Sequence, residues 1–281
     1  DDSMVMARFD PKANKQVLPI NEKADRLTRD FQLFSDNCKI LLRDGKVSAV
    51  LSKEYVILPA DKMISILENQ LKQDFTFNRG QVSHEYLMVE YLMNDEEMEQ
   101  SFRLKLNDAG ADISELKAGI RFSTSDIGAS KVYASVFYDA DGVRTTCNSG
   151  IALEHKGEAS PQLYAESCKQ LGMVFKESEE LIEKLGNMNI SDVAGVVQEI
   201  RENYSIFPKG ISEKVEAELR IQYPGGGTAI DVYLALNDII QRYSEENKIS
   251  PTRYLNLSEQ VAKLMHLPFE RIDQGEEWKK I

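Results

Sequence analysis

The sequence has few of the residues that most often carry out chemistry. Its 281 residues include three histidines, three cysteines and one tryptophan. The histidines are isolated, and Cys38, Cys147 and Cys168 form neither a CxxC pair nor the even set of a disulfide framework. The nucleotide-binding signatures GxGxxG, GxxxxGKS and GxxxxGKT are missing. We therefore expect no cofactor, no zinc site and no nucleotide loop of the common types.

Long apolar runs are missing as well. No run approaches the ~20 residues that a helix needs to cross a bilayer. The first residues, Asp1-Asp2-Ser3-Met4, lack the basic and apolar regions of a signal peptide. We expect a cytoplasmic protein that keeps its thiols reduced and has no membrane partner.

Positive charge is in the minority. The chain has 34 basic and 46 acidic side chains, which gives a net charge of −12. A surface of this charge repels polyanions on average, so a general coat for nucleic acid is disfavoured, although a local basic groove is compatible with it. Residues 158–202 contain nine acids and four bases. An acidic helical face of this kind can imitate DNA phosphates and capture a basic partner.

The residue patterns of the first half are mostly those of strands. Asp44-Gly45 and Asp141-Gly142 each lie between apolar runs, which is a strong hairpin signal. Residues 102–106 alternate apolar and basic side chains and predict a half-buried strand. Residues 60–71 instead carry apolar side chains at helical spacing.

Beyond residue 157 the patterns become helical. We predict helices in residues 164–185, after Ser191, after Ser212, after Thr228 and in residues 258–267. The fold class that follows is α+β. Residues 1–157 form a mainly antiparallel sheet with one or two helices, and residues 158–281 form a mostly helical part, either as two domains or as one continuous domain.

Two acids and a nearby Glu-x-Lys triplet follow the order found in metal-dependent nucleases. Asp139 and Asp141 would hold Mg²⁺, and Glu154 with Lys156 would act beside the attacking water. In a chain rich in Glu and Lys such sets also arise by chance, and Asp141-Gly142 is better explained as a hairpin turn. The nuclease is kept as an alternative.

Two further features have a functional and a structural interpretation. Cys147 and His155 would be a thiolate–imidazole pair if the fold brought them together, whereas a structural cysteine at a strand end is the simpler interpretation. The glycines of residues 225–227 precede a helix and would expose backbone amides to an anion. Thr228 as the N-cap of that helix explains the same pattern without a ligand.

Four segments carry a resemblance. They are a tyrosine-centred segment at 53–57, a Ser-Asp-x-Gly turn at 123–128, a strand end at 144–150 and a helix around Asn237 at 233–243. Their order is similar to that in a phage- and plasmid-borne family known as domain of unknown function 932. Asn148 follows Cys147 directly here, whereas that family has one residue between them.

The resemblance implies a mobile-element protein with no established activity. It would place Arg144, Cys147 and Asn148 near the helix of Asn237. It also points to Ser125 and Asp126, which lie in the Ser-Asp-x-Gly turn. Such residues would either form a buried hydrogen-bonded network or line a binding surface, and we favour the network.

The leading hypothesis is a non-enzymatic protein of a phage, prophage or plasmid that acts through macromolecular binding. Nucleic acid bound during replication or recombination fits this genetic setting, whereas a host protein such as a defence factor fits the acidic surface. The metal-dependent nuclease is the enzymatic alternative. A homo-oligomer is compatible with each of these hypotheses.

Overall fold

The centre of the molecule is an antiparallel sheet in which strands that are neighbours in sequence are also neighbours in space. The computed structural model describes residues 3–7, 38–43, 46–82, 86–125 and 127–280. The five strands follow the order β4-β5-β6-β7-β8. Their bounds are β4 (Phe75–Val82), β5 (Leu87–Met93), β6 (Leu116–Thr124), β7 (Val132–Ala140) and β8 (Val143–Leu153). β4 and β8 are therefore the two edges.

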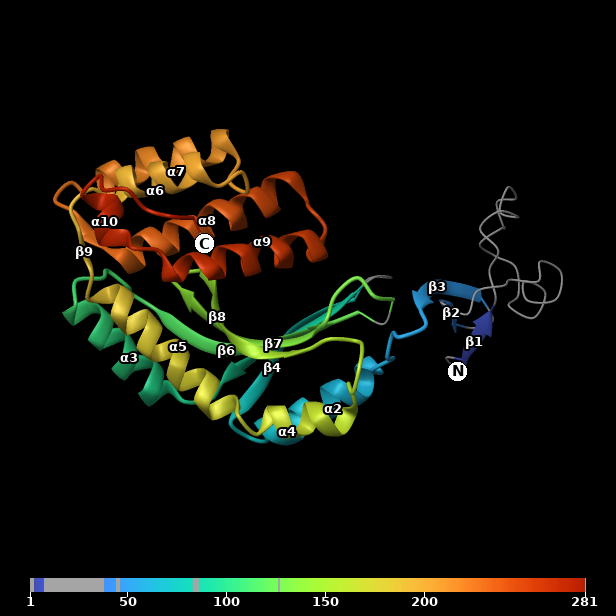
Figure 1. The fold of residues 1–281 in the computed structure, drawn as a ribbon. Coiled ribbons are helices and arrows are strands. Elements are labelled where there is room, and N and C mark those ends of the chain that lie inside the picture. Colours follow the sequence, from blue (N-terminus) through green and yellow to red (C-terminus); the bar gives the residue numbers. More distant parts are fainter. Residues whose placement is uncertain (1–2, 8–37, 44–45, 83–85, 126, 281) are drawn as a thin grey trace, which may run out of the picture.

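Helices cover both faces of this sheet (Figure 1). The helices on the lower face in the figure are α2 (Ala60–Leu71), α3 (Glu96–Asp108), α4 (Pro161–Cys168) and α5 (Leu171–Gly186). The elements of the upper part are α6 (Val193–Asn203), α7 (Lys209–Gln222), α8 (Ala229–Asn247), α9 (Pro251–Lys263), η1 (Leu264–His266) and α10 (Phe269–Asp273). α8 and α9 contact the sheet directly, while α6 and α7 pack against α8.

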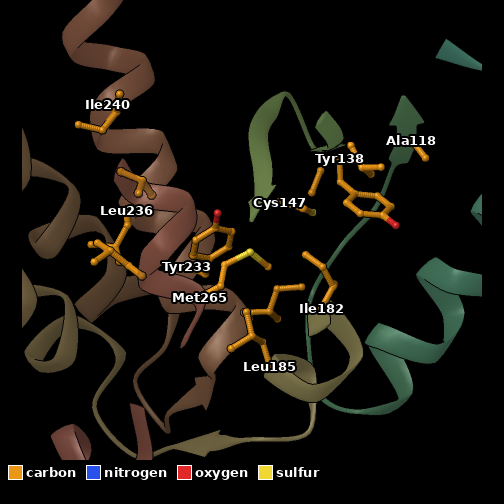
Figure 2. Close-up of a cluster of buried hydrophobic side chains, with 14 of the residues drawn as sticks. Ala118, Tyr138, Cys147, Ile182, Leu185, Tyr233, Leu236, Ile240 and Met265 are labelled. Carbon is orange, nitrogen blue, oxygen red and sulfur yellow. The ribbon is translucent and has the colours of Figure 1, made fainter. Parts of the chain in front are cut away.

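One hydrophobic cluster joins the sheet to helices on both sides. Its buried members run from Leu58, before α2, to Ile272 in α10. Figure 2 shows part of it, with Cys147 of β8 among side chains that include Ile182 of α5 and Leu236 of α8. The predicted α+β class is confirmed, with the strands mainly in the first half and the helices mainly in the second.

The described residues also form two smaller sheets. β1 (Ser3–Ala7), β2 (Cys38–Arg43) and β3 (Lys46–Ser52) form a three-stranded antiparallel sheet in the order β1-β2-β3. β2 and β3 pair up to Arg43 and Lys46, as the hairpin signal predicts, while the turn at 44–45 lies outside the described residues. β9 (Asn189–Ile190) and β10 (Gly227–Thr228) pair briefly before α6 and α8.

The second predicted hairpin turn is confirmed. Asp141 and Gly142, between β7 and β8, have φ values of 51° and 85°. Two successive residues with positive φ are what a two-residue turn matched to the strand twist requires. The Asp141 carboxylate also accepts hydrogen bonds from the backbone amides of Ser114 and Glu115.

The strand predicted at residues 102–106 is wrong, because this segment lies inside α3. Phe102 and Leu106 are four residues apart and are both buried, so the alternating pattern is also one turn of an amphipathic helix. Asp95 caps this helix through a hydrogen bond from the Met98 amide, and three glutamates follow in its first turn. These local signals outweigh the alternation.

The predicted helix starts are partly confirmed. Thr228 caps α8 and shares a capping box with Asp231. α6 is capped by Asp192 rather than Ser191, because the Asp192 carboxylate accepts the Gly195 amide. Ser212 is not a cap. It lies in the first turn of α7, where its hydroxyl donates to the carbonyl of Pro208.

A buried hydrogen bond joins α8 to the edge strand β8. The hydroxyl of Tyr233 donates to the backbone carbonyl of Thr146 at 2.7 Å, and both residues are buried. Gln241, two turns further along α8, accepts the Arg144 amide and donates to the carbonyl of Gly142. These contacts fix the position of the C-terminal helices on the sheet.

We expect Tyr233→Phe to lower the free energy of unfolding by about 1–3 kcal/mol, because it leaves a buried carbonyl without its donor. The measurement is urea denaturation followed by circular dichroism. Tyr243→Phe, on the same helix but only half-buried, is the matched control and should change stability by less than ~0.5 kcal/mol. Equal effects of the two substitutions would contradict the role given to Tyr233.

Candidate anion-binding cleft

A carboxylate is buried on the strand next to the β4 edge of the sheet. Glu90, on β5, has 0% of its surface exposed. Isolated buried carboxylates are costly, so such a group needs cations beside it. In the strand register Glu90 pairs with Arg79 on β4 and with Arg121 on β6, its direct cross-strand neighbours. The Arg121 Nε donates to Glu90 at 2.8 Å, and the Arg79 Nε donates at 2.6 Å.

An irregularity in β4 is what turns Arg79 toward Glu90. Phe77 pairs with Tyr91 and Arg79 pairs with Glu90, so two steps on β4 correspond to one step on β5. In a regular strand Phe77 and Arg79 would share a face, because side chains alternate with period two. Here the Phe77 ring contacts Tyr91, while Arg79 reaches the face of Glu90.

Gly119 leaves room for an aromatic ring that lies against two of the arginines. Phe137 on β7 lies opposite Gly119 on β6. A Cβ at Gly119 would come within 2.6 Å of the Phe137 ring. The guanidinium carbons of Arg121 and Arg144 lie 5.5 and 5.6 Å from the centre of that ring. The ring therefore supports two cations through its face.

Arg144, at the start of β8, is the third cation. Its Nη1 donates to the Glu90 carboxylate, and its Nε donates to Asp139 of β7 at 3.1 Å. The cluster thus has three guanidinium groups and two carboxylates, which leaves one positive charge in excess. Exposure of the arginine side chains increases from 3% for Arg121 to 19% for Arg144 and 49% for Arg79.

The cluster shifts the protonation equilibria of its members. Burial on its own would raise the pKa of Glu90, but the charge of Arg121, the hydrogen bond from Arg79 and the charge of Arg144 outweigh it and lower that pKa to about 2. Burial on its own would lower the pKa of Arg121, but Glu90 and nearby tyrosines raise it. Glu90 is therefore ionised and Arg121 charged at neutral pH.

A cleft of about 390 Å³ opens above the cluster. Its lining comes from the sheet and from the α8–α9 region and comprises Arg79, Gln81, Tyr86, Met88, Asp139, Gly142, Arg144, Gln241, Ser244, Glu245, Ile249 and Tyr254. The Tyr254 ring lies 5.9 Å from the Arg121 guanidinium. Arg121 therefore lies between the rings of Phe137 and Tyr254, next to the cleft.

Hydrogen-bonding capacity is left over in this cluster. The Arg121 Nη2 is buried and has no hydrogen-bond partner among the described residues. Within the same described ranges, neither Arg79 Nη1 nor Arg144 Nη2 has a hydrogen-bond partner. Guanidinium donors bind phosphate and carboxylate groups in charge-assisted pairs. An excess positive charge with spare donors in a cleft is suited to an anion.

The residues singled out in the sequence do not all meet here. Arg144 lies in the cleft, and Asp139 is its ion-pair partner. Asn237 is buried and donates to the carbonyl of Tyr233 within its own helix. Ser125 is buried near the end of β6, where its hydroxyl accepts the Ala129 amide. Asp126 and the side chain of Asn148 lie outside the described residues.

Cys147 belongs to the core rather than to the cleft (Figure 2). Its side chain is completely buried, and burial raises the pKa of its thiol to about 12. The thiol is therefore protonated at neutral pH and is a poor nucleophile. The structural interpretation of this cysteine explains its position, and the His155 ring stacks on Tyr55 instead.

The four nuclease candidates do not form one site. Asp139 and Asp141 lie where β7 turns into β8, whereas Glu154 and Lys156 follow the far end of β8 and line a separate cleft of about 420 Å³. Eleven residues of extended β8 separate the two pairs, a distance of ~36 Å. Across the described ranges, no group of three or more His, Cys, Asp or Glu side chains is placed to hold a metal ion.

Sequence reasoning missed three members of the cluster. Arg79, Glu90 and Arg121 each look like an ordinary polar position of a strand. A glutamate inside the run Leu87-Met88-Val89-Glu90-Tyr91 was the one available signal, because a charge between apolar neighbours has to be neutralised if the strand is central. Its partners are set by strand register, which the sequence patterns do not specify.

Comparisons with protein-family models, with curated proteins and with solved structures find no match to this chain. The similarity to the phage and plasmid family described above therefore stays a prediction. Among the helices of the described ranges, none has both the length and the apolar character needed to cross a membrane.

We expect Gly119→Ala to lower the free energy of unfolding by about 1–3 kcal/mol, because the new methyl group collides with the backbone carbonyl oxygen of Tyr91 and with the Phe137 ring that supports the arginines. Denaturant titration is the measurement. Gly172→Ala, at a position in α5 with open space around it, should be neutral or stabilising by up to ~1 kcal/mol. A neutral Gly119→Ala would show that the packing of this ring does not depend on the glycine.

Acid should remove the contribution of Glu90 to stability. Its pKa is lowered from 4.5 to about 2 on folding, so the contribution is complete above pH 4.5 and is lost as the pH falls toward 2. It amounts to ~3 kcal/mol at neutral pH and to roughly half of that at pH 3. The measurement is the difference in unfolding free energy between the wild type and Glu90→Gln at pH 7 and pH 3. A difference that does not shrink at the lower pH would contradict the assignment.

Proposed function

We propose that this chain is a non-enzymatic binding protein and that its arginine cleft receives a phosphate of single-stranded nucleic acid. The observation that carries the proposal is the set of three guanidinium groups around one buried carboxylate, beside a cleft that two of them, Arg79 and Arg144, line. Each of the three guanidinium groups keeps one η-nitrogen that the described residues do not use, and charged donors of this kind bind phosphate oxygens in charge-assisted hydrogen bonds.

The dimensions of the cleft favour a single strand. Its volume of about 390 Å³ falls in the range of sites that hold one small ligand. A nucleotide of a flexible single strand can turn into such a cleft, whereas a duplex presents its phosphates on a wide cylinder and requires an extended basic surface. Tyr254 also lines the cleft and offers a ring on which a base can stack.

Binding without chemistry is the simplest use of these groups. The carboxylates of Glu90 and Asp139 are both held by guanidinium groups, and the low pKa of Glu90 makes it a poor base. The nuclease alternative loses support because its four candidate residues lie at opposite ends of β8. A role in replication or recombination of a phage, prophage or plasmid is part of the proposal and rests on the resemblance alone.

The acidic-partner alternative has less support. The acids of α5 are partly neutralised within the protein, since Glu180 lies 3.8 Å from Lys176 and Glu183 lies 3.9 Å from Lys105. Exposed ion pairs of this kind leave little net field for a basic partner. The arginine cluster instead has one positive charge in excess of its own two carboxylates, at a defined place beside the cleft.

The test is fluorescence anisotropy with oligothymidylates that carry an internal dye, with and without terminal phosphates, at a series of salt concentrations. We expect binding of at least one form, with log Kd changing with log salt by a slope of ~1–2, since the two arginines that line the cleft displace few counterions. Arg144→Gln should weaken binding about tenfold, the loss of one charge-assisted hydrogen-bond pair.

Arg220→Gln is the matched control, because it removes the same charge from an exposed position on α7 away from the cleft. It should leave the affinity within about twofold, as expected for one screened surface charge. The proposal is overturned if no oligonucleotide binds at low salt, or if Arg144→Gln and Arg220→Gln weaken binding equally.

A further inference from the structure

We infer that the group recognised in the arginine cleft is a terminal phosphate, the monoester at the end of a strand, rather than an internal phosphodiester. The inference rests on the proposed function and makes it more specific. It follows from where the charges of the cleft lie.

Positive charge is confined to one side of the cleft. Arg79 and Arg144 come from the strands, with Arg121 next to them. The wall formed by α8 contributes Glu245 instead, and the exposed Glu246 follows it. A strand that passed through the cleft would have to run along both walls and bring its next phosphates to these acids. Like charges at this range repel, and a chain of net charge −12 provides no remote compensation.

A strand end avoids that repulsion. Its last phosphate can enter the cleft while the rest of the strand leaves over the edge strand β4, where Arg79 is half exposed. β4 pairs only with β5 in the described part of the chain, so that side of the cleft is not covered by another strand. Entry over β4 thus keeps the rest of the strand away from the acids of α8.

The charge and the donors fit a monoester better than a diester. A terminal phosphate carries nearly two negative charges at neutral pH and three oxygens that accept hydrogen bonds, whereas a diester carries one charge and two such oxygens. The cluster has one positive charge in excess of its carboxylates, and Arg79, Arg121 and Arg144 each keep one η-nitrogen without a partner among the described residues. A monoester, with its additional charge and oxygen, should therefore bind more tightly than a diester.

The backbone around Arg144 is held in place without help from a ligand. Gln241 of α8 accepts the Arg144 amide and donates to the carbonyl of Gly142, which fixes the β7–β8 turn against the helix. The Asp139 carboxylate accepts both from Arg144 and from the Gly142 amide. The guanidinium is thus positioned before binding, so little ordering entropy is lost when a phosphate arrives.

The experiment compares three oligothymidylates of one length with an internal dye: one with a 5′-phosphate, one with a 3′-phosphate and one with hydroxyl groups at both ends. We expect at least one phosphorylated end to bind about tenfold more tightly than the hydroxyl form. Arg144→Gln should remove this preference. Thymidine monophosphate, added as an unlabelled competitor, tests whether the phosphate needs the rest of the strand, and it should compete at higher concentration.

Glu245→Gln supplies a second variant that does not touch the arginines. It removes the acid from the α8 wall, so it should strengthen binding of the hydroxyl form and reduce the preference for a phosphorylated end. Glu246→Gln, which removes the neighbouring charge without lining the cleft, is the matched control and should preserve the preference.

The outcomes separate the two proposals. Equal affinity for all three oligonucleotides overturns the terminal-phosphate inference and leaves single-strand binding intact. Absence of binding in every case overturns both. A preference that survives in Arg144→Gln shows that a terminal phosphate is recognised elsewhere on the chain and overturns its assignment to this cleft.

Discussion

The structure depends on the neutralisation of one buried carboxylate on β5, between the edge strand β4 and β6. Glu90 is completely buried, and a charge in that position is tolerated only when cations and donors surround it. The neighbouring strands each supply one arginine by direct pairing, and the turn between β7 and β8 brings the third. Because the cluster has three guanidinium groups and two carboxylates, the arrangement that neutralises Glu90 leaves one positive charge in excess. The binding that we propose would therefore share its origin with the stability of the sheet.

The positive charge of the arginine cluster contrasts with a chain that is acidic overall. A net charge of −12 discourages non-specific association with polyanions, so contacts made by the arginine cleft are not diluted by a general basic surface. The same acidity appears at the cleft itself, which Glu245 of α8 lines together with Arg79 and Arg144. Selectivity in such a site comes from repulsion on one wall as much as from attraction on the other.

The sequence predicts those parts of the fold that are encoded locally. The Asp141-Gly142 turn, the helix 60–71 and the cap at Thr228 each depend on a few neighbouring residues, and all three are present. The segment around Phe102 was misassigned because a two-residue period over five residues also fits one helical turn. Only two members of the cluster, Asp139 and Arg144, were among the candidate residues named from the sequence. Its other members are brought together by register across three strands, and register depends on the whole sheet rather than on any single segment.

The number of residues in β4 matters because Asn78, between Phe77 and Arg79, is an additional residue in the pairing of β4 with β5. Because it is the additional residue that rotates Arg79 to the face of Glu90, the contact depends on how many residues precede it as well as on which residue it is. An insertion or deletion of one residue at this point would exchange the inward and outward faces of part of the strand. Arg79 and the other residues of the cluster would all still be present in the sequence. Insertions and deletions in β4, which an edge strand accommodates more easily than a central one, are thus a route by which the charge of the cleft could be altered without any substitution in it.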